Sequence, residues 1–343
     1  MTKRSLITGI TGQDGSLMAK KLLDHGHQVF GTYRQTSVDN LWRLRHLGII
    51  DHITLIEAKI DAYESLTELF KSKLFSHLFH FSGASYAAES FSTPWSTFST
   101  NTGAVFRLLE SIRKYAPETL ALIPCSSEVF DYSLPNLTVT TLSSASGFRP
   151  TNPYGLSHSA ISEIVDYYRQ TFGLRICLPI LFNHESEYRD PRFVVKKIVS
   201  GVVGLHDPRR GPLQIGNLDA EKDWGSAKEF VSLLHLAAEM ELNCSLVMGT
   251  GRLTSVREIV SDALKHLNFQ FEFVGHGSNE EVVCLQTGRK LVEVSKDLFR
   301  LRETPPFIAD VEECKSLLGK KPLLTVLEII PQMLLFEKSA LSL

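Results

Sequence analysis

The sequence lacks the features that mark several large classes of protein. No apolar run approaches the ~20 residues that a membrane-spanning helix needs. The formal net charge is −2, so no basic excess points to nucleic acid or to an anionic membrane surface. We therefore expect neither a membrane protein nor a nucleic-acid-binding protein.

Cysteines are few and widely spaced. The five of them form no Cys-x-x-Cys pair and stand at Cys125, Cys177, Cys244, Cys284 and Cys314. An odd number of isolated cysteines argues against a disulfide framework and against a cysteine-ligated zinc site, and we expect no metal. The first residues carry two basic side chains before an apolar run that is too short for a secretory signal. Together these features predict a cytoplasmic protein.

The residues that are present describe an ordinary globular protein. Hydrophobic residues make up 43% and charged residues 22% of the chain, which are common proportions. The length of 343 residues exceeds one typical domain of ~100–200 residues. Two packed units are therefore expected.

A glycine-rich turn near the N-terminus organises the chain. A short apolar run at residues 5–7 leads into glycines spaced by three, and apolar residues then recur at helical spacing as far as Leu23. A tight turn, a close approach to a pyrophosphate and close helix–strand packing each exclude a Cβ, and a helix N-terminus attracts phosphate. We predict that a dinucleotide cofactor is bound here by Gly9, Gly12, Gln13, Asp14 and Gly15.

Strands and helices alternate along the chain. The patterns predict further strands at 28–33, 53–56, 78–84, 120–124 and 175–181, and helices at 66–70, 98–115, from residue 153, at 227–240 and at 255–267. This order predicts an α/β fold, a Rossmann-like doubly wound parallel sheet with ligands at the carboxyl ends of its strands. We assign residues 1–182 to a dinucleotide-binding domain with the catalytic residues, and residues 183–343 mainly to a smaller α/β lobe that binds substrate.

The end of the second strand indicates which cofactor is used. In a dinucleotide-binding fold an acidic residue at this point prefers NAD, whereas an arginine can receive a 2′-phosphate. This chain has Arg34 there. The sequence therefore predicts NADP.

Four blocks of sequence carry a resemblance to a known family. They are GITGQDGS at 9–16, LFNHES at 181–186, GNLDAEKDWG at 216–225 and SVRE at 255–258. All four resemble the GDP-mannose 4,6-dehydratases, which are nucleotide-sugar enzymes of the extended short-chain dehydrogenase/reductase superfamily. The resemblance implies conversion of GDP-mannose to GDP-4-keto-6-deoxymannose, with C4 oxidation by NADP⁺, loss of water across C5 and C6, and return of hydride to C6. It also implies a homodimer or homotetramer, because residues 40–43 are similar to a segment at the family's tetramer interface.

The resemblance also implies a role for individual residues. Tyr154 matches the base that takes the hydroxyl proton during C4 oxidation, and Ser126 the hydroxyl that binds the C4 oxygen. Glu128 matches the base that removes the C5 proton and then protonates the leaving hydroxyl, and a carboxylate directly after a buried strand is costly without a partner or a role. Matching positions for binding the nucleotide sugar are Asn183, Lys197, Lys222, Arg300 and Glu303.

One departure from the family pattern leaves alternatives open. The family has lysine four residues after the tyrosine, where this chain has His158. One helical turn places His158 beside Tyr154, toward the same cofactor. Histidine, with an ordinary pKa of ~6.5, is mostly neutral at physiological pH and supplies no fixed charge to lower the tyrosine pKa, so a neighbouring cation such as Arg192 would have to compensate. The alternatives are a related nucleotide-sugar C4 reductase or epimerase, and a homologue that binds NADP and a nucleotide sugar without useful turnover.

Overall fold

The computed structural model describes residues 2–58, 63–130, 139–299 and 306–341. Its largest element is a parallel sheet in the strand order β12-β8-β5-β4-β1-β2-β3, with the short β6 also paired to β8. These strands are β1 (Arg4–Thr8), β2 (Gln28–Tyr33), β3 (Ile53–Glu57), β4 (His77–His80), β5 (Leu120–Leu122), β6 (Cys125–Ser126), β8 (Ile176–Leu181) and β12 (Ser245–Met248). The predicted Rossmann-like sheet is confirmed.

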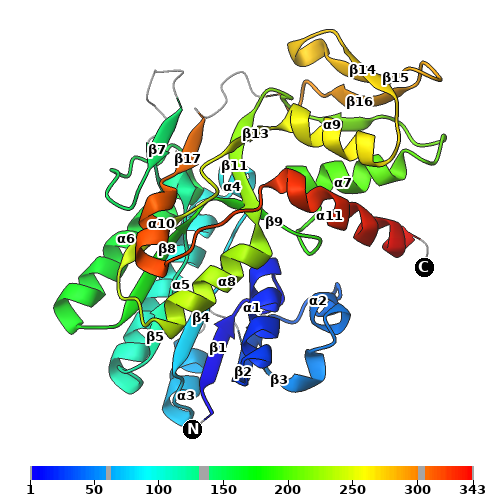
Figure 1. Cartoon of the computed structure of the whole chain (residues 1–343). Helices are drawn as coiled ribbons and strands as arrows, with labels where there is room; N and C mark the ends of the chain where they lie inside the picture. The colour runs from blue at the N-terminus through cyan, green and yellow to red at the C-terminus, as the bar shows by residue number, and fades with distance from the viewer. Residues whose placement is uncertain (1, 59–62, 131–138, 300–305, 342–343) are drawn as a thin grey trace.

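Helices cover both faces of this sheet (Figure 1). Successive strand residues face opposite layers, so Leu6 and Leu78 pack in one hydrophobic cluster while Ile7 and Phe79 pack in the other. The first layer contains α3 (Tyr63–Ser72), α5 (Pro94–Tyr115) and α6 (Pro153–Phe172). The second contains α1 (Gln13–Asp24), α2 (Trp42–His46), α8 (Ala227–Glu239) and α10 (Val311–Leu318).

A second lobe with its own core lies above the sheet in Figure 1. Its helices are α7 (Val194–Gly204), α9 (Val256–His266) and α11 (Val326–Leu341), and its small sheet joins β10 (Leu213–Ile215), β16 (Lys290–Val294), β15 (Glu281–Cys284) and β14 (Phe271–Val274). The two lobes are connected by β9 (Asn183–Glu185), β11 (Glu221–Ser226) and β13 (Leu253–Ser255). Beside them β7 (Thr140–Leu142) pairs with β17 (Phe307–Ala309), and α4 (Ala87–Ser90) precedes α5.

Two details differ from the sequence-based expectation. The strand expected at 78–84 ends at His80, because the backbone N–H of Ala84 donates to the Asn101 side chain of α5 at 2.8 Å instead of to a strand. The second half of the chain also contributes to the first unit, since α8 packs on α1 and β12 extends the large sheet.

Among the described residues, no helix is long and apolar enough to cross a membrane.

Candidate active site

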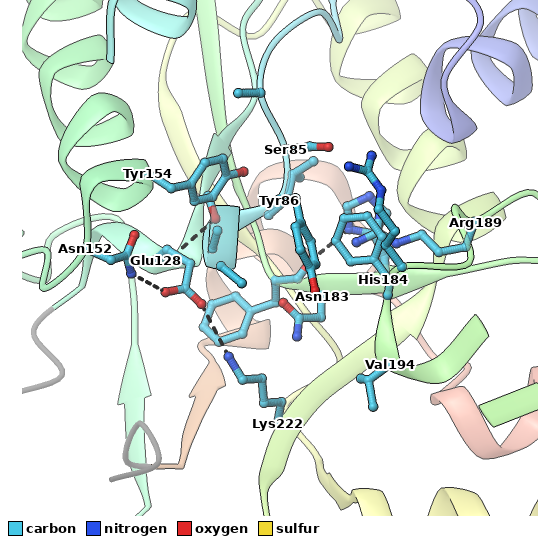
Figure 2. Close-up of a pocket in the computed structure, with 18 of the residues that line it drawn as sticks. Ser85, Tyr86, Glu128, Asn152, Tyr154, Asn183, His184, Arg189, Val194 and Lys222 are labelled. Carbon is cyan, nitrogen blue, oxygen red and sulfur yellow. Dashed lines mark hydrogen bonds and ion pairs between the residues drawn. The ribbon is translucent and has the colours of Figure 1, made fainter. Parts of the chain in front are cut away.

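A cavity of about 720 Å³ lies between the carboxyl ends of the large sheet and the second lobe (Figure 2). Its walls come from the ends of β4, β6 and β8, from the start of α6, and from β9, α7 and β11 of the connecting strands and second lobe. This is the edge at which parallel α/β sheets bind ligands. Four of the residues that line it are Ser126, Glu128, Tyr154 and His158, all singled out from the sequence.

The three glycines of the N-terminal turn differ in how strictly the fold requires a residue without a side chain. Gly9 has φ +74°, and a Cβ there would lie 2.7 Å from the backbone of Phe81. A Cβ on Gly15 would lie 2.3 Å from the Gly9 carbonyl oxygen. A Cβ on Gly12 would meet only that same oxygen, at 3.4 Å. The fold itself therefore needs Gly9 and Gly15, whereas Gly12 leaves room beside the α1 N-terminus, where a phosphate is stabilised.

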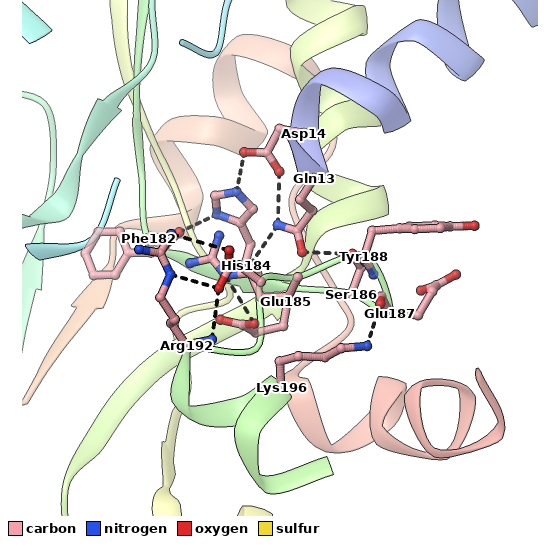
Figure 3. Close-up of polar contacts among 12 residues, drawn as sticks. Gln13, Asp14, Phe182, His184, Glu185, Ser186, Glu187, Tyr188, Arg192 and Lys196 are labelled. Atoms are coloured by element: carbon pink, nitrogen blue, oxygen red, sulfur yellow. Dashed lines mark hydrogen bonds and ion pairs between the residues drawn. The ribbon is translucent and has the colours of Figure 1, made fainter. Parts of the chain in front are cut away.

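Gln13 and Asp14, expected to bind cofactor, direct their side chains to β9 and the residue that follows it (Figure 3). The Asp14 carboxylate is 2.9 Å from His184 Nε2, and Gln13 Nε2 donates to the His184 carbonyl at 3.2 Å. Burial disfavours the charged form of both side chains. The attraction between the Asp14 carboxylate and the His184 imidazolium outweighs this effect, so the pKa of His184 is raised and the pKa of Asp14 is lowered. The Ser186 hydroxyl also donates to Gln13 Oε1 at 2.8 Å. These contacts fix the start of α1 against β9, a function that the sequence did not reveal.

Glu128 is held by residues from two other elements. Asn152 caps α6 by accepting from the Gly155 N–H at 2.7 Å, and its Nδ2 donates to Glu128 Oε2 at 2.8 Å. Lys222 of β11 contacts Glu128 Oε1 at 3.3 Å. Lys222 was expected to bind the nucleotide sugar, and in this structure its ammonium pairs with the Glu128 carboxylate. Asn152 was not predicted, although the Asn-Pro sequence at a helix start is a recognisable cap signal.

The turn that carries Glu128 is packed tightly against α6. Ser126 accepts from the Glu128 N–H at 3.2 Å, which begins the short helical turn Ser127–Val129. A Cβ on Gly155 would lie 2.1 Å from the Glu128 carbonyl oxygen, so only glycine permits this approach. The close packing brings Tyr154 and Glu128 to the same wall of the cavity (Figure 2).

Tyr154 and His158 share a poorly solvated environment. Desolvation raises the pKa of Tyr154 to about 12, against a hydrogen bond with Ser126 that lowers it. Desolvation, with the repulsion of His80, lowers the pKa of His158 to about 4. The buried Nδ1 of His158 has no hydrogen-bond partner among the described residues. His158 is therefore neutral at pH 7, with one ring nitrogen that is buried and unpaired among those residues.

The cation whose charge lowers the pKa of Tyr154 is Arg189, not Arg192 as suggested from the sequence. Arg192 is exposed, and it pairs with Asp190 at 3.0 Å and with Glu89 at 3.4 Å. Arg189 instead lowers the pKa of Tyr154 through its charge, although desolvation outweighs this effect. Arg189 also lines the cavity and stacks on Phe193, with its guanidinium carbon 3.6 Å from the ring centroid.

The other predicted ligand-binding residues divide into three groups. Asn183 and Lys197 line the cavity, and Lys197 makes no ion pair with any residue that the structure describes. Arg34 is exposed just beyond β2 and is not among the residues that line the cavity. Arg300 and Glu303 lie outside the described residues.

Comparison with known proteins identifies the family of this chain. A family model described as GDP-mannose 4,6 dehydratase matches residues 6–333. A GDP-mannose 4,6-dehydratase from Vibrio cholerae is 31% identical over 98% of this chain and 94% of its own length, and one from Drosophila melanogaster is 29% identical over 97% and 85%.

Solved structures share the fold at lower sequence identity. A UDP-glucose 4-epimerase from Thermotoga maritima has a TM-score of 0.81 at 20% identity, covering 98% of this chain and 99% of that one. A dTDP-glucose 4,6-dehydratase from Bacillus anthracis has a TM-score of 0.80 at 16% identity, covering 98% and 97%. Because the family model spans nearly all of the sequence, the chain belongs to the GDP-mannose 4,6-dehydratase family.

Proposed function

We propose that this protein is an NADP-dependent nucleotide-sugar 4,6-dehydratase that converts GDP-mannose to GDP-4-keto-6-deoxymannose. The observation that carries the proposal is the position of Glu128, a carboxylate on the same cavity wall as Tyr154 and fixed there by Asn152 and Lys222. A C4 reductase or epimerase has no need of such a base, so that alternative is less well supported.

Each residue has a defined task in this reaction. The chemistry that a bound nicotinamide supplies is removal of hydride from C4 and its return to C6. Tyr154 takes the C4 hydroxyl proton while Ser126 holds the oxygen by a hydrogen bond. The C4 ketone acidifies the C5 proton, which Glu128 removes and then delivers to the C6 hydroxyl, so that one water leaves. Return of hydride to C6 is completed by protonation of C5, and this proton balances the one that Tyr154 took from the C4 hydroxyl. Asn152 and Lys222 hold the carboxylate at the sugar.

The features around α1 support a dinucleotide with a 2′-phosphate. The start of α1 has room at Gly12 for a pyrophosphate, and the unpartnered His158 Nδ1 suits a ribose hydroxyl near the nicotinamide. Arg34, exposed after β2, makes no ion pair with a described residue. We assign the 2′-phosphate of NADP to Arg34, because an arginine fork matches phosphate geometry.

A guanosine diphosphate would be held on the second-lobe side of the cavity. Lys197 and Asn183 line that side together with Arg189. Burial lowers the pKa of Lys197, as expected for a cation that lacks an anionic partner, and a diphosphate would supply one. Lys222 is then left to Glu128 and is not counted among the phosphate ligands.

We also propose a homodimer or homotetramer. The two adjacent helices α5 and α6 expose large apolar side chains, namely Trp95, Phe106, Leu156, Tyr167 and Phe172. An exposed apolar surface of this kind is typical of an interface. Light scattering coupled to size-exclusion chromatography would measure the assembly, and a monomer would contradict the proposal.

One observation favours a second candidate function, which is binding without turnover. Tyr154 has a pKa raised to about 12, and the neutral His158 gives it no charge to lower that value. A tyrosine that stays protonated at pH 7 is a poor base. This candidate uses the same cavity and the same ligands.

Incubation with NADP⁺ and GDP-mannose, followed by mass spectrometry, tests both candidates. A product lighter by one water supports the dehydratase. Binding of both ligands without product supports the second candidate. Absence of GDP-mannose binding, with NADP⁺ still bound, would overturn the substrate assignment.

A further inference from the structure

The amino ends of the large sheet, opposite the cavity, carry a group of histidines. His27 immediately precedes β2, and His77 is the first residue of β4. His235 and Glu239 lie one turn apart near the C-terminus of α8, which packs against α1. Among the described residues, His27, His235 and Glu239 each place a potential ligand atom within 4.8 Å of the others.

The hydrogen bonds around this group leave ligand atoms available. His27 Nδ1 is bound to the fully buried Ser5 hydroxyl at 2.8 Å, so that its Nε2 faces Glu239 Oε1 at 3.7 Å. His235 is only 6% exposed, and its Nε2 has no hydrogen-bond partner among the described residues. Buried polar atoms in proteins nearly always have a partner, so an unpaired imidazole nitrogen beside a carboxylate points to a missing ligand.

The third histidine of the group, His77, also has a ring nitrogen that is unpaired within the described part of the chain. The rings of His77 and His27 stack with centroids 5.8 Å apart. His77 Nδ1 is also buried without a hydrogen-bond partner among the described residues. The interior of this end of the sheet therefore contains two unsatisfied imidazole nitrogens, on His77 and His235, beside the carboxylate of Glu239.

We propose that His27, His235 and Glu239 bind a divalent transition-metal ion, with Zn²⁺ as the best-matched ion. Two imidazoles and one carboxylate are a donor set that zinc accepts, with a water as fourth ligand. Glu239 is exposed, which gives the ion and that water access from solvent. Zinc bonds of about 2.0 Å place neighbouring ligand atoms about 3.3 Å apart, so the three side chains need only small rotations.

Lys3 competes with the metal for Glu239. Its ammonium contacts both carboxylate oxygens, at 2.9 and 2.8 Å. Both side chains of this pair are partly exposed, and a surface ion pair contributes little free energy, so the ammonium can move into solvent when a metal binds. A bound ion would then join the C-terminal end of α8 to the connection between α1 and β2.

The sequence did not predict this site. The expectation of no metal rested on cysteine spacing, whereas these ligands are two histidines and a glutamate. His27 is about 200 residues from the other two in sequence, so only the packing of α1 on α8 brings the set together. The site is also separate from the proposed dehydratase chemistry, and its test does not depend on activity.

Calorimetric titration of the untagged, metal-free protein with ZnCl₂ tests the proposal. We expect one Zn²⁺ per chain, and at least tenfold weaker binding in Glu239→Gln and in His235→Gln. Lys3→Ala should bind several-fold more tightly, because the competing cation is removed. His266→Gln is the matched control, since His266 pairs with Asp262 on α9 but has no third potential ligand in the part of the chain that the structure describes. It should bind like the wild type.

Other outcomes overturn the proposal. Equal affinity in wild type and Glu239→Gln would place the ion elsewhere, and absence of Zn²⁺ binding would exclude the site. Co²⁺ offers a second readout, because charge-transfer absorption from a thiolate would show binding at a cysteine such as Cys244 instead. If His235→Gln does not fold, judged by circular dichroism, the exposed Glu239→Gln and Lys3→Ala variants still decide the question.

Discussion

The ring of Tyr154 lies edge-to-face with the ring of His158, with centroids 4.6 Å apart and planes at 66°. In the family that this chain belongs to, a lysine is expected in place of this histidine. The two groups differ in charge, because the pKa of His158 is lowered to about 4 and the ring is neutral at pH 7. The position next to the proposed base therefore provides a hydrogen-bonding nitrogen but no cation.

This relationship predicts how activity depends on pH. Below the raised pKa of Tyr154, the fraction of tyrosinate increases tenfold for each pH unit, so kcat/KM should rise from neutral toward alkaline pH. His158→Lys adds a cation one helical turn away, which should lower the pKa of Tyr154 and raise activity at pH 7. His158→Gln, which is also neutral, should keep the wild-type profile. If the pH profiles of kcat/KM coincide for wild type and His158→Lys, the charge at position 158 does not control the pKa of Tyr154.

The carboxylate of Glu128 gives a second prediction, on the step that it performs. Glu128→Gln keeps the size and the hydrogen-bonding capacity of the side chain but removes the base. We expect dehydration to fall by about 10²–10⁴-fold. Reduced cofactor should still form, because C4 oxidation uses Tyr154. Binding of both ligands, measured by calorimetry, should be unchanged, and a variant with wild-type turnover would exclude Glu128 as the base.

Arg34 gives a third prediction, on cofactor choice. Arg34→Ala removes the proposed partner of the 2′-phosphate, and a charge-assisted hydrogen bond contributes about 1.5–3 kcal/mol, so NADP affinity should fall about 10- to 100-fold. NAD affinity should change little, because NAD lacks that phosphate. Arg209→Ala, at an exposed arginine of the second lobe, is the control. An equal loss for both cofactors would contradict the assignment.

Period and turn signals were sufficient to predict six strands of the large sheet and the longer helices that cover it, but not β12 or the second-lobe helices α7 and α11. Strand residues alternate between the two helix layers, as Leu6 and Ile7 do, and this alternation depends on local sequence only. The positions of Ser126, Glu128, Tyr154 and His158 around one cavity also follow, since carboxyl ends of parallel strands share an edge of the sheet.

Pairings between distant side chains could not be predicted. Whether Lys222 contacts a phosphate or Glu128, and whether Asp14 contacts a cofactor or His184, depends on how β9 and β11 cross the end of the sheet. Segments separated by about 100 residues or more meet there, and no local pattern records their register. The effect of Arg189 rather than Arg192 on Tyr154 is of the same kind.

Two adjacent lysines on α7 give a fourth prediction, because they have opposite environments. Lys197 lines the cavity, whereas Lys196 is buried, donates to the Glu187 carbonyl at 2.7 Å and pairs with Glu337. Lys197→Ala should therefore weaken GDP-mannose binding about tenfold or more with an unchanged melting temperature. Lys196→Ala should lower the melting temperature, because it leaves the partly buried Glu337 carboxylate and the Glu187 carbonyl without this partner. Calorimetry and thermal unfolding of both variants separate these effects, and a reversed pattern would contradict the phosphate role of Lys197.

The buried histidines give a fifth prediction, on acid stability of the metal-free protein. Burial lowers the pKa of His77, His80, His158 and His235 to about 4 in each case. The unfolded chain, with histidine pKa values of ~6.5, binds more protons than the folded chain between these limits, so folding free energy is lost as pH falls from 6.5 to 4. Denaturant unfolding across this range, with a chelator present, measures the loss.

A single substitution isolates one of these groups. His80 is 6% exposed, and its shift corresponds to at most about 3 kcal/mol. His80→Gln retains a hydrogen-bonding group toward Thr8, whose hydroxyl is 2.7 Å from His80 Nδ1, but cannot titrate. The variant should therefore lose less stability between pH 6.5 and 4 than the wild type does. His52→Gln, at an exposed histidine, should follow the wild type. Wild-type stability that stays constant over this pH range would mean that these histidines are not held neutral by burial.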